Sequence, residues 1–223
     1  LPCKVITFGK DPEKSIYSAA DIVFDQLARA SYTLLIEGRP EGTITLGVPG
    51  MHNVYNSLSA IAASRELGIS MEKIRTGLFH FTGTNRRFEK KGEIGGVTVI
   101  DDYAHHPQEI RATLTTAKNY PHKKLWCVFQ PHTYTRTAAL LDDFVQALME
   151  ADEVILADIY AAREVNTIGI SSADVAERIQ AAGGKAHYIP SFDDIETFIL
   201  ENCVPGDLLI TMGAGDIVKV GEK

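Results

Sequence analysis

The chain has 223 residues, of which 45% are hydrophobic and 23% charged, so it suits one large or two small globular domains and excludes disordered and fibrous classes. A formal net charge of −7 argues against nucleic acid as an obligatory partner, because phosphate binding needs clustered lysine and arginine. The 3 cysteines are widely spaced and give no disulfide framework or zinc-ligand spacing, and without an apolar run of roughly 18 residues or a signal peptide we expect a cytoplasmic protein.

The first third of the chain alternates short β-rich runs with turn signals and then becomes helical. We predict strands over Lys4–Phe8, Ile22–Phe24, Tyr32–Glu37 and Thr43–Val48, followed by helices that begin at His52 and Ser70. The strands have the spacing of an antiparallel meander. Gly68 is placed to end the first helix, and the Ser70 side chain can cap the second. Because the chain begins with Leu1 and its first strand is already under way at Lys4, we expect a fragment of a longer protein.

Beyond a polar break at residues 83–85, strands and helices alternate. We predict strands over Val97–Ile100, Leu125–Phe129, Glu153–Ala157, Ala186–Ile189 and Asp207–Thr211, and helices over Pro107–Tyr120, Ala138–Glu150, Ser172–Ala182 and Phe192–Asn202. Repeated β-α units with short connections predict an α/β fold with a doubly wound, mostly parallel sheet. We place the domain boundary at Arg86, which gives domains of residues 1–86 and 87–223.

Ligands bind outside the carboxyl ends of the strands in such a sheet, and the segment Asp101–Pro107 leaves the first of them. Its adjacent carboxylates suit a ribose diol or a hydrated cation, and the imidazoles of His105 and His106 suit hydrogen bonds or metals. One aspartate can instead cap a turn while one histidine is merely exposed. A metal-dependent hydrolase that uses Asp101, Asp102 and both histidines is a further alternative, although paired histidines without a third ligand at defined spacing are a weak signal.

The segment Gln130–Thr137 leaves the next strand and contains a guanidinium, an imidazole and several hydroxyls ahead of a predicted helix. The N-terminus of a helix favours an anion, and the fork of Arg136 can hold a carboxylate in a bidentate manner. Thr135 or Thr137 can equally cap that helix while Arg136 contributes only surface charge.

Three shorter motifs complete the polar inventory. In the first predicted helix Asn53 can be an N-cap, whereas the amide of Asn56 offers the donor and acceptor that an adenine edge requires. Residues 86–89 form a charged cluster, and residues 213–216 read most simply as a turn. No GxxxxGK[ST] motif occurs in the sequence, so the chain shows no P-loop for a triphosphate.

Taken in order, five motifs resemble the Mur ligase family, whose members build the peptide of bacterial peptidoglycan. They are Gly50-x-His52-Asn53-x-x-Asn56, Asn85-Arg86-Arg87-Phe88-Glu89, Asp101-Asp102-Tyr103-Ala104-His105-His106-Pro107, Gln130-Pro131-His132-x-Tyr134-x-Arg136-Thr137 and Gly213-Ala214-Gly215-Asp216. The double histidine and the Gln-Pro-His segment are most similar to members that join L-alanine to UDP-N-acetylmuramate. Members that attach a recycled tripeptide share much of the pattern and remain the nearest alternative.

The resemblance implies a three-domain enzyme that uses ATP and Mg²⁺. ATP phosphorylates the carboxylate of UDP-N-acetylmuramate, the amine of L-alanine attacks the acyl phosphate, and phosphate leaves. Residues 1–86 would be the distal part of the central ATP-binding domain, and residues 87–223 the Rossmann-like domain that brings in the amino acid. The UDP-binding domain, the P-loop and the magnesium ligands would lie upstream, so the resemblance implies no activity for this chain alone, and its oligomeric state is open.

For the nucleotide, the resemblance assigns roles to four residues. Asn53 and Asn56 match the helix start that faces the adenine base. Arg87 matches the interdomain arginine that reaches the phosphates, and Asp102 matches the acid that holds the ATP ribose.

For the incoming amino acid, the resemblance places His106 and Arg136 nearby, with Arg136 on the carboxylate and His105 and His132 in supporting positions. Position 133 is threonine where some relatives carry a basic residue, so the carboxylate clamp would be thinner here. None of these groups is an obvious general base. The expected catalytic residues Arg87, His106 and Arg136 would therefore act by positioning and charge neutralisation.

Overall fold

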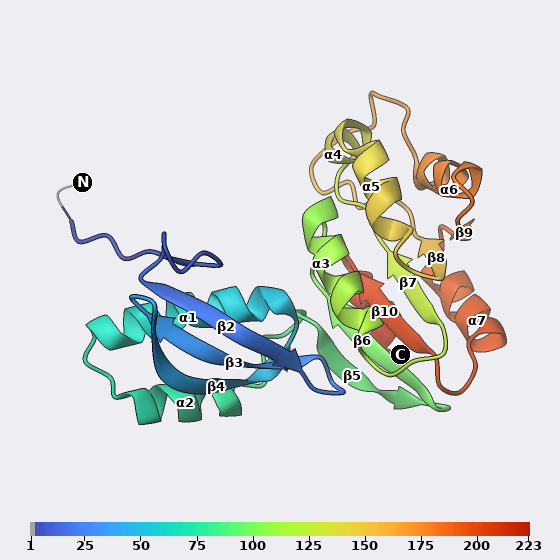
Figure 1. The fold of residues 1–223 in the computed structure, drawn as a ribbon. Helices are drawn as coiled ribbons and strands as arrows, with labels where there is room; N and C mark the ends of the chain where they lie inside the picture. Colours follow the sequence, from blue (N-terminus) through green and yellow to red (C-terminus); the bar gives the residue numbers. More distant parts are fainter. Residues whose placement is uncertain (1–2) are drawn as a thin grey trace. The chain divides into compact units, whose positions relative to one another are not determined.

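The computed structural model describes residues 3–223, which divide into two compact units between Gly83 and Thr84 (Figure 1). The sequence places the boundary slightly later, at Arg86. Leu1 and Pro2, on which the expectation of a fragment partly rests, lie outside the described residues.

The first unit is a small sheet covered by two helices. Its strands are β1 (Phe8–Gly9), β2 (Tyr17–Phe24), β3 (Arg29–Ile36) and β4 (Arg39–Pro49), in the order β1-β2-β3-β4, and its helices are α1 (Met51–Glu66) and α2 (Met71–His80). Strands β2 to β4 pair antiparallel, which confirms the predicted meander. Alternate side chains of β3 and β4, such as Tyr32, Leu34 and Ile44, are buried against Leu58 and Ile61 of α1, because successive residues of a strand point to opposite faces.

Two local predictions in this unit are wrong. Lys4–Phe8 does not form a strand, since only Phe8 belongs to β1 and Val5 is 55% exposed; within this run Ile6 packs against the core of the unit. Ser70 precedes α2 as its N-cap residue but makes no capping hydrogen bond with its side chain. Gly68, by contrast, has φ +76° directly after α1, which confirms it as the residue that ends this helix.

The second unit contains the six-stranded sheet. Its strands are β5 (Glu89–Ile94), β6 (Val97–Asp102), β7 (Leu125–Phe129), β8 (Glu153–Leu156), β9 (Ala186–Tyr188) and β10 (Leu208–Met212), in the order β5-β6-β10-β7-β8-β9. All pairs are parallel except β5 with β6. The last strand of the chain therefore lies between the second and third of this sheet's strands, and the α/β, doubly wound and mostly parallel prediction is confirmed.

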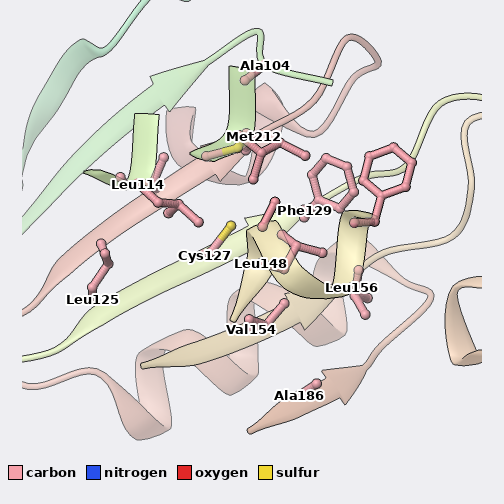
Figure 2. Close-up of a cluster of buried hydrophobic side chains, with 14 of the residues drawn as sticks. Ala104, Leu114, Leu125, Cys127, Phe129, Leu148, Val154, Leu156, Ala186 and Met212 are labelled. Atoms are coloured by element: carbon pink, nitrogen blue, oxygen red, sulfur yellow. The ribbon is translucent and has the colours of Figure 1, made fainter. Parts of the chain in front are cut away.

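Helices cover both faces of this sheet. They are α3 (Pro107–Lys118), α4 (Tyr134–Ala139), α5 (Leu141–Leu148), α6 (Ser172–Ala181), α7 (Phe192–Asn202) and α8 (Val218–Glu222). Figure 2 shows the core on the face of α3 and α5, where Leu114 and Leu148 lie over Cys127 and Phe129 of β7. Trp126 and Val128 point to the opposite face, into the core with α7 and α8. Strand β7 is thus buried on both sides, as its continuous apolar run predicts.

Three elements of this unit differ from the prediction. The helix expected over Ala138–Glu150 is two helices, α4 and α5, which meet at Leu140. Strand β5 was not predicted because its sequence, Glu-Lys-Lys-Gly-Glu-Ile, has the charges of a solvent-facing edge strand rather than an apolar pattern. Helix α8 is too short to give a periodic signal. Among the described residues, no helix is long and apolar enough to span a membrane.

Candidate functional site

The polar segments of the second unit leave one edge of the sheet. In the sheet register Met212 of β10 lies opposite both Asp102 of β6 and Phe129 of β7. The segments 101–107, 130–137 and 213–216 therefore begin side by side at the carboxyl ends of neighbouring parallel strands (Figure 1). This is the place where a doubly wound sheet binds its ligands.

An ion pair between partly buried Arg86 and fully buried Asp101 holds this edge together. Arg86 donates from Nε to Asp101 at 2.9 Å, and its Nη atoms donate to the carbonyl oxygens of Gly213 at 2.7 Å and Gly215 at 3.1 Å. The Asp101 carboxylate is fully buried and also accepts a hydrogen bond from the Thr211 hydroxyl at 2.7 Å. Arg86 and Asp101 thus join three segments of the second unit. This pairing leaves no local pattern, because in the sequence Arg86 resembles any other surface charge.

Asp102 is also engaged by the protein itself. One carboxylate oxygen accepts a hydrogen bond from the backbone N–H of Ala104 at 2.8 Å, and the other accepts from that of Phe88 at 2.9 Å. Burial raises the pKa of Asp102, against the effect of these hydrogen bonds. Since each carboxylate oxygen can accept a further hydrogen bond, the ribose role of Asp102 stays a prediction. Its visible role is to fix residues 86–88 against the end of β6.

Arg87 is presented by a strained loop. The residues on either side of it, Arg86 and Phe88, have φ values of +60° and +48°, which are uncommon for side chains of this size and are concentrated at functional sites. Arg87 itself is exposed, and its guanidinium lies 5.7 Å from the centroid of the Tyr103 ring. The loop therefore presents the Arg87 guanidinium, which contacts the Tyr103 ring, at the surface of the second unit.

The double histidine begins helix α3. Nδ1 of His106 accepts the backbone N–H of Gln108 at 3.3 Å, and Glu109 accepts those of His105 and His106 at 3.1 and 3.3 Å. This is a capping box, in which the side chains of the N-cap residue His106 and of Glu109 accept hydrogen bonds from free N–H groups at the start of the helix. Because a backbone N–H can only donate, His106 carries its proton on Nε2 in this arrangement. That nitrogen is the one left to face a ligand.

His132 lies between two other rings. Its ring centroid is 5.9 Å from that of His105 and 5.5 Å from that of Tyr160, on which it stacks. Burial is the main cause that lowers the pKa of His132, and the nearby charge of Arg136 adds to it. Its Nδ1 atom is buried and has no hydrogen-bond partner among residues 3–223. A neutral imidazole with an unused polar atom is thus placed beside Arg136.

Arg136 also has a buried polar atom without a partner, and this atom belongs to a charged group. Its Nη1 atom is buried without a hydrogen-bond partner among the described residues. A buried donor left unpaired is costly, and a guanidinium donor more so. Such a group is well suited to an anion with two acceptor oxygens, because carboxylates pair with the arginine fork in a bidentate manner.

Glu164, from the loop after β8, joins this cluster and was not foreseen. Its Oε1 accepts the hydroxyls of Thr133 at 2.6 Å and Thr135 at 2.5 Å, and its Oε2 accepts the backbone N–H of Thr135 at 2.9 Å. These hydrogen bonds, first those from Thr133 and Thr135 side chains, lower the pKa of Glu164 to about 2. The sequence-based expectation that Thr135 or Thr137 caps the helix is wrong, since Thr137 donates back to the carbonyl of Thr133.

Residues 213–216 pack closely against the side chain of Gln130 rather than forming an ordinary turn. Gln130 donates to Asp216 at 3.2 Å and accepts the backbone N–H of Ile217 at 3.3 Å. A Cβ at Gly215 would lie well inside van der Waals contact of the side-chain oxygen of Gln130 and 2.9 Å from the ring of Tyr160, so a larger residue there would displace these side chains. A hollow of about 420 Å³ adjoins Gln130 and Asp216 and includes Asp158 and Asp193 in its lining. This acidic lining does not suit a carboxylate or a phosphate.

In the first unit, the two predicted asparagines contact each other. Asn53 donates to the carbonyl of Pro49 at 2.7 Å and accepts a hydrogen bond from the amide of Asn56 at 3.0 Å. Gly50, not Asn53, is the N-cap residue of α1, so the capping explanation of Asn53 is wrong. Asn56 is exposed, and its amide oxygen remains available to a base edge.

The arrangement gives no support to the metal-dependent hydrolase. Asp101 and Asp102 direct their oxygens to Arg86 and to backbone N–H groups, rather than to a shared point with His105 and His106. No group of three or more His, Cys, Asp or Glu side chains within residues 3–223 is arranged to hold a metal ion.

Known proteins match most of this chain. The family model described as Mur ligase, glutamate ligase domain, matches residues 86–215. The UDP-N-acetylmuramate–L-alanine ligase of Lachnospira eligens is 64% identical over 99% of this chain, and that of Agathobacter rectalis is 56% identical over 100% of it. The match spans 48% of each of those proteins, so this chain covers about half their length.

Solved structures show the same relationship. The crystal structure of the UDP-N-acetylmuramate–alanine ligase from Thermotoga maritima superposes with a TM-score of 0.82 at 29% identity, over 97% of this chain and 46% of that one. The murein peptide ligase from Psychrobacter arcticus gives 0.64 at 26% identity, over 96% and 44%. With a family model that covers more than half of its length, this chain belongs to the Mur ligase family.

Proposed function

We propose that this chain is the C-terminal half of an ATP-dependent ligase that joins L-alanine to UDP-N-acetylmuramate through an acyl phosphate, in the cytoplasmic stage of peptidoglycan synthesis. The observation that carries the proposal is the Nη1 atom of Arg136, which is buried without a hydrogen-bond partner among residues 3–223. It provides a cationic fork for a small carboxylate, which the incoming amino acid supplies. The 64% identical relative with the same named activity supports the choice of L-alanine.

In this proposal the second unit holds the amino acid. Arg136 binds the carboxylate of the amino acid. The neutral ring of His132 lies beside Arg136 and does not compete with it for the anion. His106 offers Nε2 as a donor, and His105 orients the ring of His132 by edge contact. The amine of L-alanine loses its protons as the amide bond forms and phosphate leaves, and none of these groups is an obvious general base for them. Their contribution is to hold the amine in position to attack the acyl phosphate.

Four residues keep the nucleotide roles that the resemblance assigns to them. Asn53 and Asn56 offer paired amides to the adenine base, Asp102 offers its remaining acceptor capacity to the ribose, and Arg87 offers an exposed guanidinium to the phosphates. Mg²⁺ supplies charge neutralisation on the phosphates when it is bound. We assign its ligands and the P-loop to segments upstream of these residues, so this chain alone is expected to be inactive.

The tripeptide-recycling ligase is the second candidate, because its pattern of motifs is similar. The L-alanine-adding enzyme from T. maritima matches this structure with the higher TM-score, 0.82 against 0.64 for the murein peptide ligase. The most similar relatives also carry the L-alanine name. These two observations favour L-alanine.

A phosphate-release assay tests the proposal. The full-length ligase that contains these residues should release phosphate only when ATP, UDP-N-acetylmuramate and L-alanine are all present, and a tripeptide should not replace L-alanine. The chain of 223 residues alone should give no turnover above background. Turnover by the chain alone would contradict the assignment of the phosphate-handling residues to upstream segments. A preference for the tripeptide would establish the second candidate instead.

A further inference from the structure

We propose that Glu164 is a positioning residue for the amino-acid site, which sets the direction of Arg136 by tying the start of helix α4 to the loop that follows β8. The inference rests on the proposed function, because Arg136 is taken to bind the carboxylate of the amino acid. It concerns a residue that no sequence motif indicates.

The contacts of Glu164 are concentrated on one turn of chain. Its carboxylate accepts hydrogen bonds from Thr133 at 2.6 Å and from the hydroxyl and N–H of Thr135 at 2.5 and 2.9 Å. Thr133 is the N-cap residue of α4 but makes no capping hydrogen bond with its own side chain. Glu164 therefore replaces the missing cap from outside the helix and satisfies an N–H group of the first turn.

Arg136 lies in this same short helix. Tyr134–Ala139 has six residues, too few to be stable as an isolated helix, so external contacts must fix its direction. Behind Arg136, both the N–H and the hydroxyl of Thr137 donate to the carbonyl of Thr133, at 2.9 and 2.7 Å. Thr133, whose hydroxyl donates to Glu164, is therefore hydrogen-bonded directly to the helical turn that carries the Arg136 guanidinium.

The loop that supplies Glu164 is itself anchored beside the site. Tyr160 donates its backbone N–H to Pro131 at 2.9 Å, and its ring stacks on that of His132. Further along, Asn166 closes the loop by donating to the carbonyl of Ile170 at 2.8 Å. The loop after β8 thus contacts the 130–137 segment at two points, at His132 and at the start of α4. Both points flank the groups assigned to the amino acid.

The hydrogen-bonding pattern suits a carboxylate better than a neutral side chain. All three donors, two hydroxyls and one N–H, point at acceptor oxygens, and an ionised carboxyl group accepts on both oxygens. Glutamine at position 164 can accept the N–H of Thr135 with its single oxygen and donate to the threonine hydroxyls with its NH₂ group, but it loses the charge that strengthens these hydrogen bonds. Alanine would remove all three bonds. The structure therefore predicts a graded series in which Glu164→Gln lies between the unsubstituted protein and Glu164→Ala.

Steady-state kinetics of the full-length ligase tests this inference. Glu164→Ala should raise the KM for L-alanine by about tenfold, with a smaller rise for Glu164→Gln. The KM values for ATP and UDP-N-acetylmuramate and the kcat should stay within roughly twofold, since a positioning role acts on one substrate. The matched control is Glu201→Ala, which removes an exposed glutamate at the end of α7 and should leave all constants unchanged. Glu164→Gln is the variant that decides the test if the alanine variant does not fold.

Several outcomes would overturn the inference. An unchanged KM for L-alanine in both Glu164 variants would do so, as would equal rises of all three KM values, which would indicate a general structural role. If Arg136→Ala raises the KM for L-alanine while the Glu164 variants do not, the inference fails and the proposed function stands. An unsubstituted ligase that does not respond to L-alanine would overturn both.

Discussion

Replacing Arg136 with alanine in the full-length ligase is expected to raise the KM for L-alanine by roughly a hundredfold, because two charge-assisted hydrogen bonds to the carboxylate are lost. The reason lies in a guanidinium nitrogen that is buried and has no hydrogen-bond partner in the described part of the chain. The affinity for ATP should change little, since no nucleotide role is assigned to this residue. Initial rates of phosphate release at varied L-alanine concentration give the measurement.

Arg178→Ala is the matched control for this substitution. Arg178 belongs to the same unit and pairs with Asp142, but both side chains are largely exposed, at 57% and 85%, and such pairs contribute little. Arg136→Lys should recover only part of the affinity, because an ammonium group lacks the bidentate fork. An unchanged KM for L-alanine in Arg136→Ala would show that the carboxylate is bound elsewhere.

Replacing Arg86 with methionine is expected to lower the free energy of unfolding of the second unit by about 3–5 kcal/mol, the usual cost of leaving one partner of a buried ion pair alone. The substitution leaves the fully buried Asp101 carboxylate without its cationic partner. It also removes the hydrogen-bond donors to the carbonyl oxygens of Gly213 and Gly215. Urea unfolding followed by Trp126 fluorescence measures it directly. This tryptophan is the only one in the chain and is buried in the second unit.

The neighbouring arginine provides the control. Arg87 is exposed and contacts the Tyr103 ring, so Arg87→Met should change the unfolding free energy by less than about 0.5 kcal/mol. Two adjacent arginines are thus expected to differ severalfold in their effect on stability. Equal losses in the two variants would show that the loop as a whole, rather than the pair of Arg86 with Asp101, stabilises this edge.

The α/β architecture could be predicted from sequence because each buried strand carries its own signal. Leu125–Phe129 is apolar throughout and was predicted with the bounds that the structure gives. The edge strand β5 carries charges, since one of its sides meets water, and periodicity therefore missed it. The helix over Ala138–Glu150 was predicted as continuous because its apolar pattern does not show the change of direction at Leu140.

The site was predicted less completely, for a different physical reason. Sequence order showed that Asp101, Asp102 and the two histidines leave a strand together, but not which carboxylate would be used internally. Asp101 is paired with Arg86, which is 15 residues away in sequence, and the bonds between Glu164 and the threonines cross 29 and 31 residues. Pairings at such distances leave no local pattern. Chemistry carried by one segment can be read from sequence, whereas contacts between loops depend on the strand order.

The most direct test of the central claim is the structure of the full-length ligase with L-alanine bound. The carboxylate is predicted to lie within hydrogen-bond distance of the Arg136 guanidinium, with Glu164 still bonded to Thr133 and Thr135. A structure in which the carboxylate is held by other groups, with Arg136 not in contact with it, would contradict the account.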